Sequence, residues 1–264
     1  MKIYVLKGSD IMRYFIIFLI TVSAAIGSKD YIVEVSNAVR RELPVYCVER
    51  SDKNIAITFD NAWDNKELPI ILDTLKKHGA KATFYVTGGW VDRYPEDLKK
   101  IYEAGHQIGN HSNKHPHIGK MNKSQVKDEI MECHHKVKEL LGIDMVVFRP
   151  PYGEYNNTVI KTSRELGYEV IQWSVDSLDW MDYSAAEIIN KVVNHKKMTG
   201  GAIVLMHTGA KYTGSALDEL ISKLKEKGYT FTTVEDLIYK DNFTINHEGK
   251  QIKKVIKDEG VQVE

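Results

Sequence analysis

The sequence predicts an α/β fold in which short apolar strands alternate with helices around a parallel sheet. Five times a helical pattern ends in a glycine and an apolar segment follows at once; these glycines are Gly79, Gly105, Gly142, Gly167 and Gly228. A glycine at this place accepts the left-handed conformation that closes the last helical turn. A strand, a crossover helix and a second parallel strand form the repeating unit of α/β sheets and barrels. We therefore expect the carboxyl ends of the strands to converge on one face.

The elements follow one another from residue 54 to residue 239. The segment 54–59 is nearly continuously apolar, as expected for a strand that is covered on both faces. The other expected strands are 83–86, 145–148, 169–173, 202–206 and 230–232. The expected helices are 67–78, 95–104 (which opens with a proline), 124–141, 158–166, 185–195, 217–227 and 234–239.

Length and charge limit the class of protein. A chain of 264 residues suits one large domain, and its 43% hydrophobic content supports an ordinary packed core. Lysine plus arginine equal aspartate plus glutamate at 36 each, so there is no basic field to attract nucleic acid. We expect a monomer that binds no nucleic acid.

The N-terminal segment 1–27 differs from the rest. Basic residues precede a charge-free apolar run at 14–27, which is shorter than the ~20 residues of a membrane span but suits the core of a signal peptide. Three interpretations stay open: a cleaved signal, an uncleaved membrane anchor, and a buried first helix. Either export form places the main domain outside the cytoplasm, secreted or anchored at the cell wall, with the membrane reached only through this segment.

The remaining boundaries follow from composition. Residues 28–44 are polar and mixed in charge, and are predicted to form a stem before a compact domain at 45–240. In 241–264 charged residues interrupt the apolar ones, which predicts a loosely packed polar tail. The two cysteines, Cys47 and Cys133, leave open one disulfide or two free thiols.

Polar residues follow successive strands of the predicted sheet. They are Asp60, Asn61, Asn110, His111, Arg149, Asp176, Asp179 and His207. His111 and His115 are four residues apart, and on one helical turn this spacing would point both imidazoles to one side, which suits a divalent metal. Each position alone also has a structural interpretation, such as an Asx turn, a rigid turn, a helix cap or a satisfied histidine. Their recurrence at strand end after strand end favours a catalytic site.

At these residues the chain resembles the polysaccharide deacetylases of carbohydrate esterase family 4, the NodB-homology domain. The resemblance covers about 55–237, and five motifs match in order: Thr58-Phe59-Asp60-Asn61, His111-Ser112-Asn113-Lys114-His115-Pro116, Arg149-Pro150-Pro151-Tyr152, Asp176-Ser177-Leu178-Asp179-Trp180 and Leu205-Met206-His207. The sporulation and cell-wall branches of the family are the more similar ones. The resemblance implies a distorted (β/α) barrel that removes acetyl groups from N-acetylated sugars with a divalent metal, zinc first, with cobalt, manganese and nickel as alternatives.

The resemblance also implies roles for individual residues. The catalytic residues would be Asp60 as general base, Arg149 holding Asp60, His207 as general acid, and Asp179 orienting His207. The metal ligands would be Asn61, His111 and His115. The slot for the acetyl methyl would be formed by Tyr152, Trp180 and Leu205, with the Tyr152 backbone N–H facing the oxyanion.

Asn61 departs from the family pattern, which has a second aspartate here as the third metal ligand. An asparagine still offers a carbonyl oxygen but brings no negative charge, so weaker metal binding is expected. An active enzyme with weak metal binding, an altered site and an inactive site all stay open. We expect an exported peptidoglycan deacetylase acting on N-acetylglucosamine or N-acetylmuramic acid. The alternatives are a chitin or exopolysaccharide deacetylase and a catalytically impaired carbohydrate-binding protein on the same fold.

Overall fold

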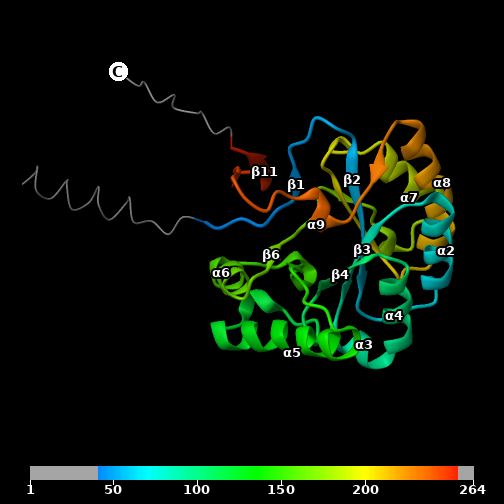
Figure 1. Cartoon of the computed structure of the whole chain (residues 1–264). Coiled ribbons are helices and arrows are strands. Elements are labelled where there is room, and N and C mark those ends of the chain that lie inside the picture. The colour runs from blue at the N-terminus through cyan, green and yellow to red at the C-terminus, as the bar shows by residue number, and fades with distance from the viewer. Residues whose placement is uncertain (1–40, 255–264) are drawn as a thin grey trace, which may run out of the picture. The chain divides into compact units, whose positions relative to one another are not determined.

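The computed structural model describes residues 41–254 (Figure 1). The expected export segment 1–27, most of the stem and the last ten residues lie outside the described residues, so these assignments stay predictions. Within 41–254 we find no helix with the length and apolar character needed to cross a membrane. Glu42 forms an ion pair with Arg164 at 2.6 Å. The packed part of the chain therefore begins slightly before the expected boundary at 45.

A curled parallel sheet forms the centre of the fold. Its strand order is β6-β5-β4-β3-β2-β8-β7, and β9 also pairs with β2. The strands are β2 (Asn54–Asn61), β3 (Ala82–Val86), β4 (Gln107–Asn110), β5 (Val147–Phe148), β6 (Glu169–Val170), β7 (Val175–Asp176), β8 (Ile203–His207) and β9 (Thr230–Phe231). The strand expected at 169–173 is shorter than predicted, ending at Val170, and β7 was not expected; the chain leaves one end of the sheet after β6 and rejoins the other end at β7.

The chain before β2 contacts the sheet beside β6 and beside β8. Val45 forms a bridge with Ile171, and Cys47 forms one with Ala202. Residues 45–48 thus link the β6 and β8 sides of the curled sheet, whose end strands β6 and β7 do not pair with each other among the described residues. This arrangement confirms the expected α/β class and the distorted barrel.

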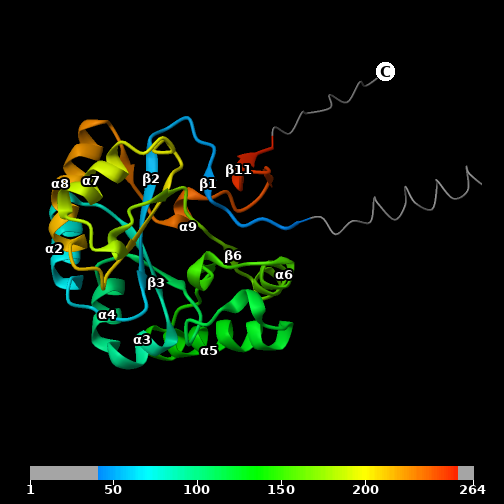
Figure 2. The same ribbon diagram turned by 180° about the vertical axis from the view of Figure 1, so that it is seen from behind.

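Helices cover the outside of the sheet (Figures 1 and 2). They are α2 (Leu68–His78), α3 (Gly88–Arg93), α4 (Pro95–Glu103), α5 (Lys123–Leu141), α6 (Asn157–Glu165), α7 (Ala185–Val193) and α8 (Thr213–Glu226). The short α9 (Val234–Leu237) instead packs with Ala56 and Tyr85 on the opposite face. The five glycines that follow the expected helices all have positive φ, between 58° and 86°. Side-chain caps mark helix starts: Asn122 and Ser184 form capping boxes before α5 and α7. α3 was not expected from the sequence, and α8 begins four residues earlier than expected.

Successive side chains of β2 point to opposite faces, so the core forms two clusters and the polar side chains of Thr58 and Asp60 point inward. Ile57 and Phe59 pack in the larger cluster, which lies with the helices, whereas Ala56 packs in a smaller one with Tyr85 and residues of β5 and β8. Because successive side chains of a strand point to opposite faces, Thr58 and Asp60 share the face of Ala56. Asp60 therefore reaches the inner side of the curled sheet at its carboxyl edge.

The C-terminal region corrects the prediction of a loosely packed tail. β10 (Phe243–Ile245) and β11 (Lys250–Lys253) form a hairpin, and β11 pairs in parallel with β1 (Cys47–Val48). Gln251 is fully buried, and its amide accepts from the Tyr239 N–H and donates to the Tyr239 carbonyl. The sequence does not show this, because the hairpin buries a polar residue and leaves its lysines in water.

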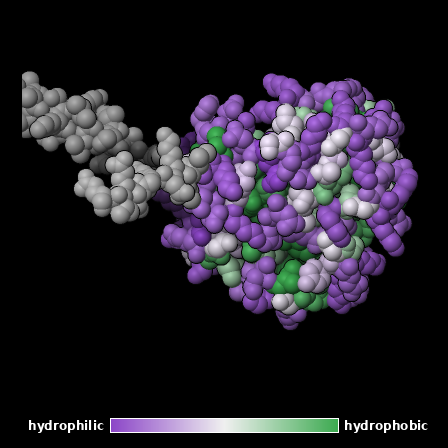
Figure 3. All heavy atoms as spheres, turned by 45° about the horizontal axis from the view of Figure 1, so that its top comes forward, coloured by the Kyte–Doolittle hydropathy of each residue, from purple (hydrophilic) through white to green (hydrophobic). Residues whose placement is uncertain are grey.

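Both thiols are free. Cys133 is buried in α5, where its Sγ donates to the Val86 carbonyl at 3.3 Å, and Cys47 lies half-buried in β1. On the face shown in Figure 3, hydrophilic residues cover most of the surface and hydrophobic ones form small groups between them. The monomeric state stays a prediction.

Candidate active site

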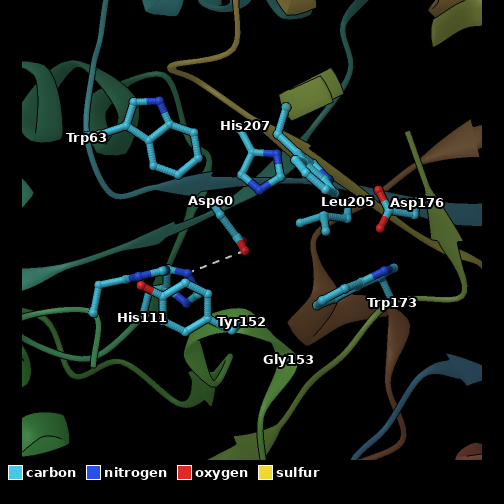
Figure 4. Close-up of a pocket in the computed structure, with 11 residues that line it drawn as sticks. Asp60, Trp63, His111, Tyr152, Gly153, Trp173, Asp176, Leu205 and His207 are labelled. Atoms are coloured by element: carbon cyan, nitrogen blue, oxygen red, sulfur yellow. Dashed lines mark ion pairs between the residues drawn. The ribbon is translucent and has the colours of Figure 1, made fainter. Parts of the chain in front are cut away.

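A cavity of about 410 Å³ opens at the carboxyl edge of the sheet (Figure 4). Its lining comes from the ends of several strands and the loops after them: Asp60, Trp63, His111, His115, Tyr152, Gly153, Trp173, Asp176, Trp180, Leu205 and His207. Of the ten residues assigned by resemblance, seven line or face this cavity directly: Asp60, His111, His115, Tyr152, Trp180, Leu205 and His207. The other three, Asn61, Arg149 and Asp179, are fully buried beside it.

Asp60 ends β2 between His207 of β8 and Tyr85 of β3. Its Oδ1 accepts from the Arg149 Nη1 at 2.7 Å, and its Oδ2 lies 3.5 Å from the His111 Nε2. Burial alone would raise the pKa of the Asp60 carboxyl, but the charge and hydrogen bond of Arg149, together with His111 and His207, outweigh burial and lower that pKa. Asp60 is therefore an ionised carboxylate at neutral pH, the form that accepts a proton.

Arg149 is held by several partners, although its Nε has none. Its Nη1 also donates to the Thr58 hydroxyl at 2.8 Å, its Nη2 donates to the Gln172 carbonyl at 3.2 Å, and its guanidinium lies 4.1 Å from the Tyr85 ring centre. A planar, permanently charged fork suits these simultaneous contacts, which a lysine ammonium could not make. The geometry agrees with a side chain that fixes Asp60.

His207 forms the second pair with Asp179. The His207 Nδ1 lies 2.7 Å from Asp179 Oδ1, while Asp179 Oδ2 accepts from the His207 backbone N–H and from the Thr213 hydroxyl. Burial alone would lower the pKa of His207, but the hydrogen bond and charge of Asp179 outweigh burial and raise it. Because Nδ1 is engaged by Asp179, Nε2 is the ring nitrogen left for the cavity, on the side of Asp60 (Figure 4).

The two histidines expected to bind metal, His111 and His115, lie on a loop after β4, which corrects the expected helical turn. Ser112 and His115 have φ of 67° and 57°, and it is this irregular turn that brings the His111 and His115 rings to 4.9 Å between centroids. Burial lowers the pKa of both, that of His115 to about 4, so each imidazole is neutral and able to bind a metal. The His111 Nδ1 donates to the Arg149 carbonyl at 2.7 Å, which leaves Nε2 as the ring nitrogen available to a metal.

Asn61 carries the strongest sign of an absent ligand. It is 0% exposed, yet neither its amide nitrogen nor its amide oxygen has a hydrogen-bond partner. Buried polar atoms in proteins are nearly always satisfied, so an unpartnered pair points to a group that is bound there. Its backbone carbonyl accepts from Thr87, and the adjacent Val86 carbonyl accepts from His111, which places Asn61 and His111 at the same level of the sheet edge.

These donors fit a divalent cation. Among residues 41–254 no three His, Cys, Asp or Glu side chains cluster as a metal site, because this set has two imidazoles and an amide. Two imidazole nitrogens and an amide oxygen are ligand atoms of the kind that zinc-like transition metals accept, but none of them carries a negative charge. The expected weak affinity stays a prediction.

The three residues assigned to the acetyl slot lie in the cavity lining. Leu205 is nearly buried, whereas Tyr152 and Trp180 are 59% and 54% exposed at the rim. Tyr152 has φ of 57°, and its ring stacks on His117 with 4.6 Å between centroids. An apolar floor with an aromatic rim suits a methyl group and a sugar ring.

Four lining residues received no role from the sequence: Trp63, Gly153, Trp173 and Asp176. Asp176 belongs to a recognised motif, and burial raises the pKa of its carboxyl. Trp173 lies beside the guanidinium of Arg149, 5.7 Å from centroid to carbon. Trp63 stacks on His207. Their closeness to predicted strand ends was the available signal, but an aromatic residue near a strand end is usually core.

The fold and site define a sugar deacetylase scaffold, and comparison with known proteins identifies the family. Residues 48–171 match the model of the polysaccharide deacetylase family. The chain is 36% identical over 202 residues to the peptidoglycan-N-acetylmuramic acid deacetylase PdaA of Bacillus subtilis, covering 74% of each. This chain belongs to the polysaccharide deacetylase family.

Other relatives differ in extent and in character. The chain is 40% identical over 188 residues to the peptidoglycan-N-acetylglucosamine deacetylase PgdA of Listeria monocytogenes, but this match spans only 39% of that protein. The solved structure of PdaA, a family 4 carbohydrate esterase, superposes with a TM-score of 0.69 and 35% identity over 74% of this chain and 84% of that one. A family 4 pseudoenzyme from Bacillus anthracis superposes with a TM-score of 0.71 and 34% identity, over 74% and 68%.

Proposed function

We propose that this protein removes acetyl groups from the N-acetylated sugars of peptidoglycan, using a divalent metal. One observation carries the proposal: a carboxylate paired with Arg149 and an imidazole whose pKa is raised by Asp179 lie on adjacent strand ends and face one cavity. Hydrolysis of an amide needs a base for water and an acid for the departing nitrogen, and this pair supplies both.

The chain's own residues divide the work between the two sides of the cavity. Asp60 takes a proton from the attacking water, and Arg149 keeps it charged and oriented. His207 gives a proton from Nε2 to the sugar nitrogen as the bond to the acetyl carbon breaks, while Asp179 holds Nδ1. Leu205, Trp180 and Tyr152 surround the acetyl methyl, and the Tyr152 backbone N–H stabilises the oxyanion.

The metal would be held by His111, His115 and Asn61. When bound, such an ion polarises the acetyl carbonyl and makes water more acidic. The unpartnered amide of Asn61 and the neutral imidazoles support this set.

The substrate and the location rest on the family relatives. Their names include deacetylases of both N-acetylglucosamine and N-acetylmuramic acid in peptidoglycan, and our proposal covers both sugars. A cell-wall substrate requires a domain outside the cytoplasm, in agreement with the apolar run at 14–27. Fractionation that found the native protein only in the cytoplasm would remove the cell-wall substrate from the proposal.

Acetate release from purified peptidoglycan tests the reaction, and mass analysis of the digested muropeptides then identifies the sugar. Asp60→Asn should keep the metal and lose most turnover, whereas His111→Ala should lose both. Near-normal turnover in Asp60→Asn would contradict the role of Asp60.

A catalytically impaired binding protein is the second candidate. Asn61 in place of an acidic ligand and the similarity to a family pseudoenzyme favour it. Glycan binding by the wild type without acetate release, at saturating zinc or cobalt, would establish this alternative.

A further inference from the structure

Trp63 occupies a position for which the proposed reaction has so far given no role. It lies on the loop after β2, three residues beyond Asp60, and its ring stacks on His207 with 5.3 Å between centroids and 28° between planes (Figure 4). It also lines the cavity and is 42% exposed. A large, exposed aromatic side chain stacked on an otherwise buried histidine covers one face of that imidazole.

The loop that carries Trp63 is fixed on both sides of it. The Ala62 carbonyl accepts from the Arg93 Nη2 at 2.8 Å, and the Asp64 carbonyl accepts from the Thr208 hydroxyl at 3.4 Å. The second contact ties the loop to the residue that follows His207. The indole and the imidazole are thus held in register by the backbone on which each stands.

Gly209 supplies the space for this stacking. A Cβ at Gly209 would lie 2.2 Å from the Trp63 Nε1 and 2.5 Å from its Cδ1. Gly209 is absent from the positive-φ glycines, so the backbone there does not require glycine. The close approach of the indole is therefore the reason that a side chain does not fit at this position.

We propose that Trp63 is a positioning residue for His207. The hydrogen bond from Asp179 fixes Nδ1 but leaves the imidazole free to rock about that contact, and a ring stacked on its face removes this freedom. Nε2 is then held on the side of Asp60, where the leaving nitrogen must be protonated. An acid displaced by ~1 Å can cost up to ~10²-fold in rate, so this restraint matters for turnover rather than for binding.

The inference rests on the proposed deacetylation, and the test is a set of variants assayed for acetate release with metal saturated. Trp63→Ala and Gly209→Ala should each lower kcat about tenfold and change KM less than threefold, and Trp63→Phe should restore most of the loss. Gly119→Ala is the matched control, because a Cβ there meets its nearest atom at an ordinary 3.5 Å and the backbone has no positive φ. It should leave kcat and KM unchanged.

A double-variant cycle isolates the contact. If Gly209→Ala acts by displacing the indole, it should cost nothing further in the Trp63→Ala background. If Gly209→Ala lowers kcat equally in both backgrounds, the proposal is overturned. A tenfold higher KM in Trp63→Ala at unchanged kcat would also overturn it, because Trp63 would then act in binding the sugar.

A measurement that does not depend on enzyme activity separates this inference from the proposed function. The downfield proton NMR signal of the His207 ring N–H bonded to Asp179, assigned by its loss in His207→Gln, should broaden in Trp63→Ala and Gly209→Ala but not in Gly119→Ala. An unchanged signal in both stacking variants refutes the positioning role. If the variants show the expected signal changes but the wild type releases no acetate, the reaction is refuted and the positioning role stands.

Discussion

Replacing Asn61 separates the cost of an unpartnered buried amide from its use as a metal ligand. Asn61→Asp puts a carboxylate into a fully buried site next to the charged Asp60. A buried charge without a compensating partner typically costs about 3–5 kcal/mol of unfolding free energy. Because 1 kcal/mol shifts the melting temperature of a 150–250-residue domain by about 2–4 °C, the metal-free variant should melt roughly 6 °C or more below wild type.

Metal should narrow this difference. A charged oxygen ligand should tighten the dissociation constant at least tenfold, and each tenfold adds about 1.4 kcal/mol at saturating metal. Thermal unfolding with chelator and with a zinc titration measures both effects. Asn61→Ala removes both unpartnered atoms, each of which costs about 1–3 kcal/mol when buried, so it should unfold at or above the wild-type temperature without metal and gain little from metal.

Asn110 provides the control, because it is also buried at a strand end but is fully bonded. Its amide donates to the Ile130 carbonyl and the Tyr168 hydroxyl and accepts from the Ser112 N–H. Asn110→Ala should therefore destabilise the protein equally with and without metal. Equal or weaker zinc affinity in Asn61→Asp, or a stability loss in Asn61→Ala as large as in Asn110→Ala, would refute the assignment of Asn61 as a ligand.

Three further predictions follow from the buried pairs and the C-terminal hairpin. Asp179→Asn removes the group that raises the pKa of His207, so the alkaline limb of the pH profile of kcat should move to lower pH; an unmoved limb would assign it to another group. Arg149→Met should cost about 3–5 kcal/mol of unfolding free energy at pH 7. The lowered pKa of Asp60 stabilises the fold fully only above the ordinary value of 3.8, and this stabilisation is lost as pH falls. In denaturant titrations the loss of unfolding free energy caused by Arg149→Met should therefore shrink below about pH 4. A loss that does not depend on pH would contradict the pairing. A chain ending at residue 240 should lose about 2–3 kcal/mol, because it strips the buried partner Gln251 from the backbone of the preceding residues, and unchanged denaturation would show that the hairpin is not part of the packed fold.

The order of elements was predictable because it is encoded in short-range patterns. Helix caps, glycines in left-handed conformation and apolar runs act within about one turn or one strand, so all five glycine junctions, and the strand ends that carry Asp60 and His207, could be located before any tertiary contact was known. The residues at the strand ends converge because parallel strands bring their carboxyl ends to the same edge. The family motifs added a role to each of these residues.

The tertiary structure decided what depends on partners distant in the chain. The loop conformation that brings His111 toward His115 is set by contacts to Val86 and Arg149, not by a helical repeat. The C-terminal hairpin forms because β1, some 200 residues earlier, offers an edge to pair with. The place of Trp63 over His207 depends on a missing Cβ at Gly209. By itself the sequence determined which residues lie at the edge of the sheet, because local backbone preferences fix where each strand ends. Only the packed structure determined which of these residues are in contact, because contact depends on the space that other elements leave.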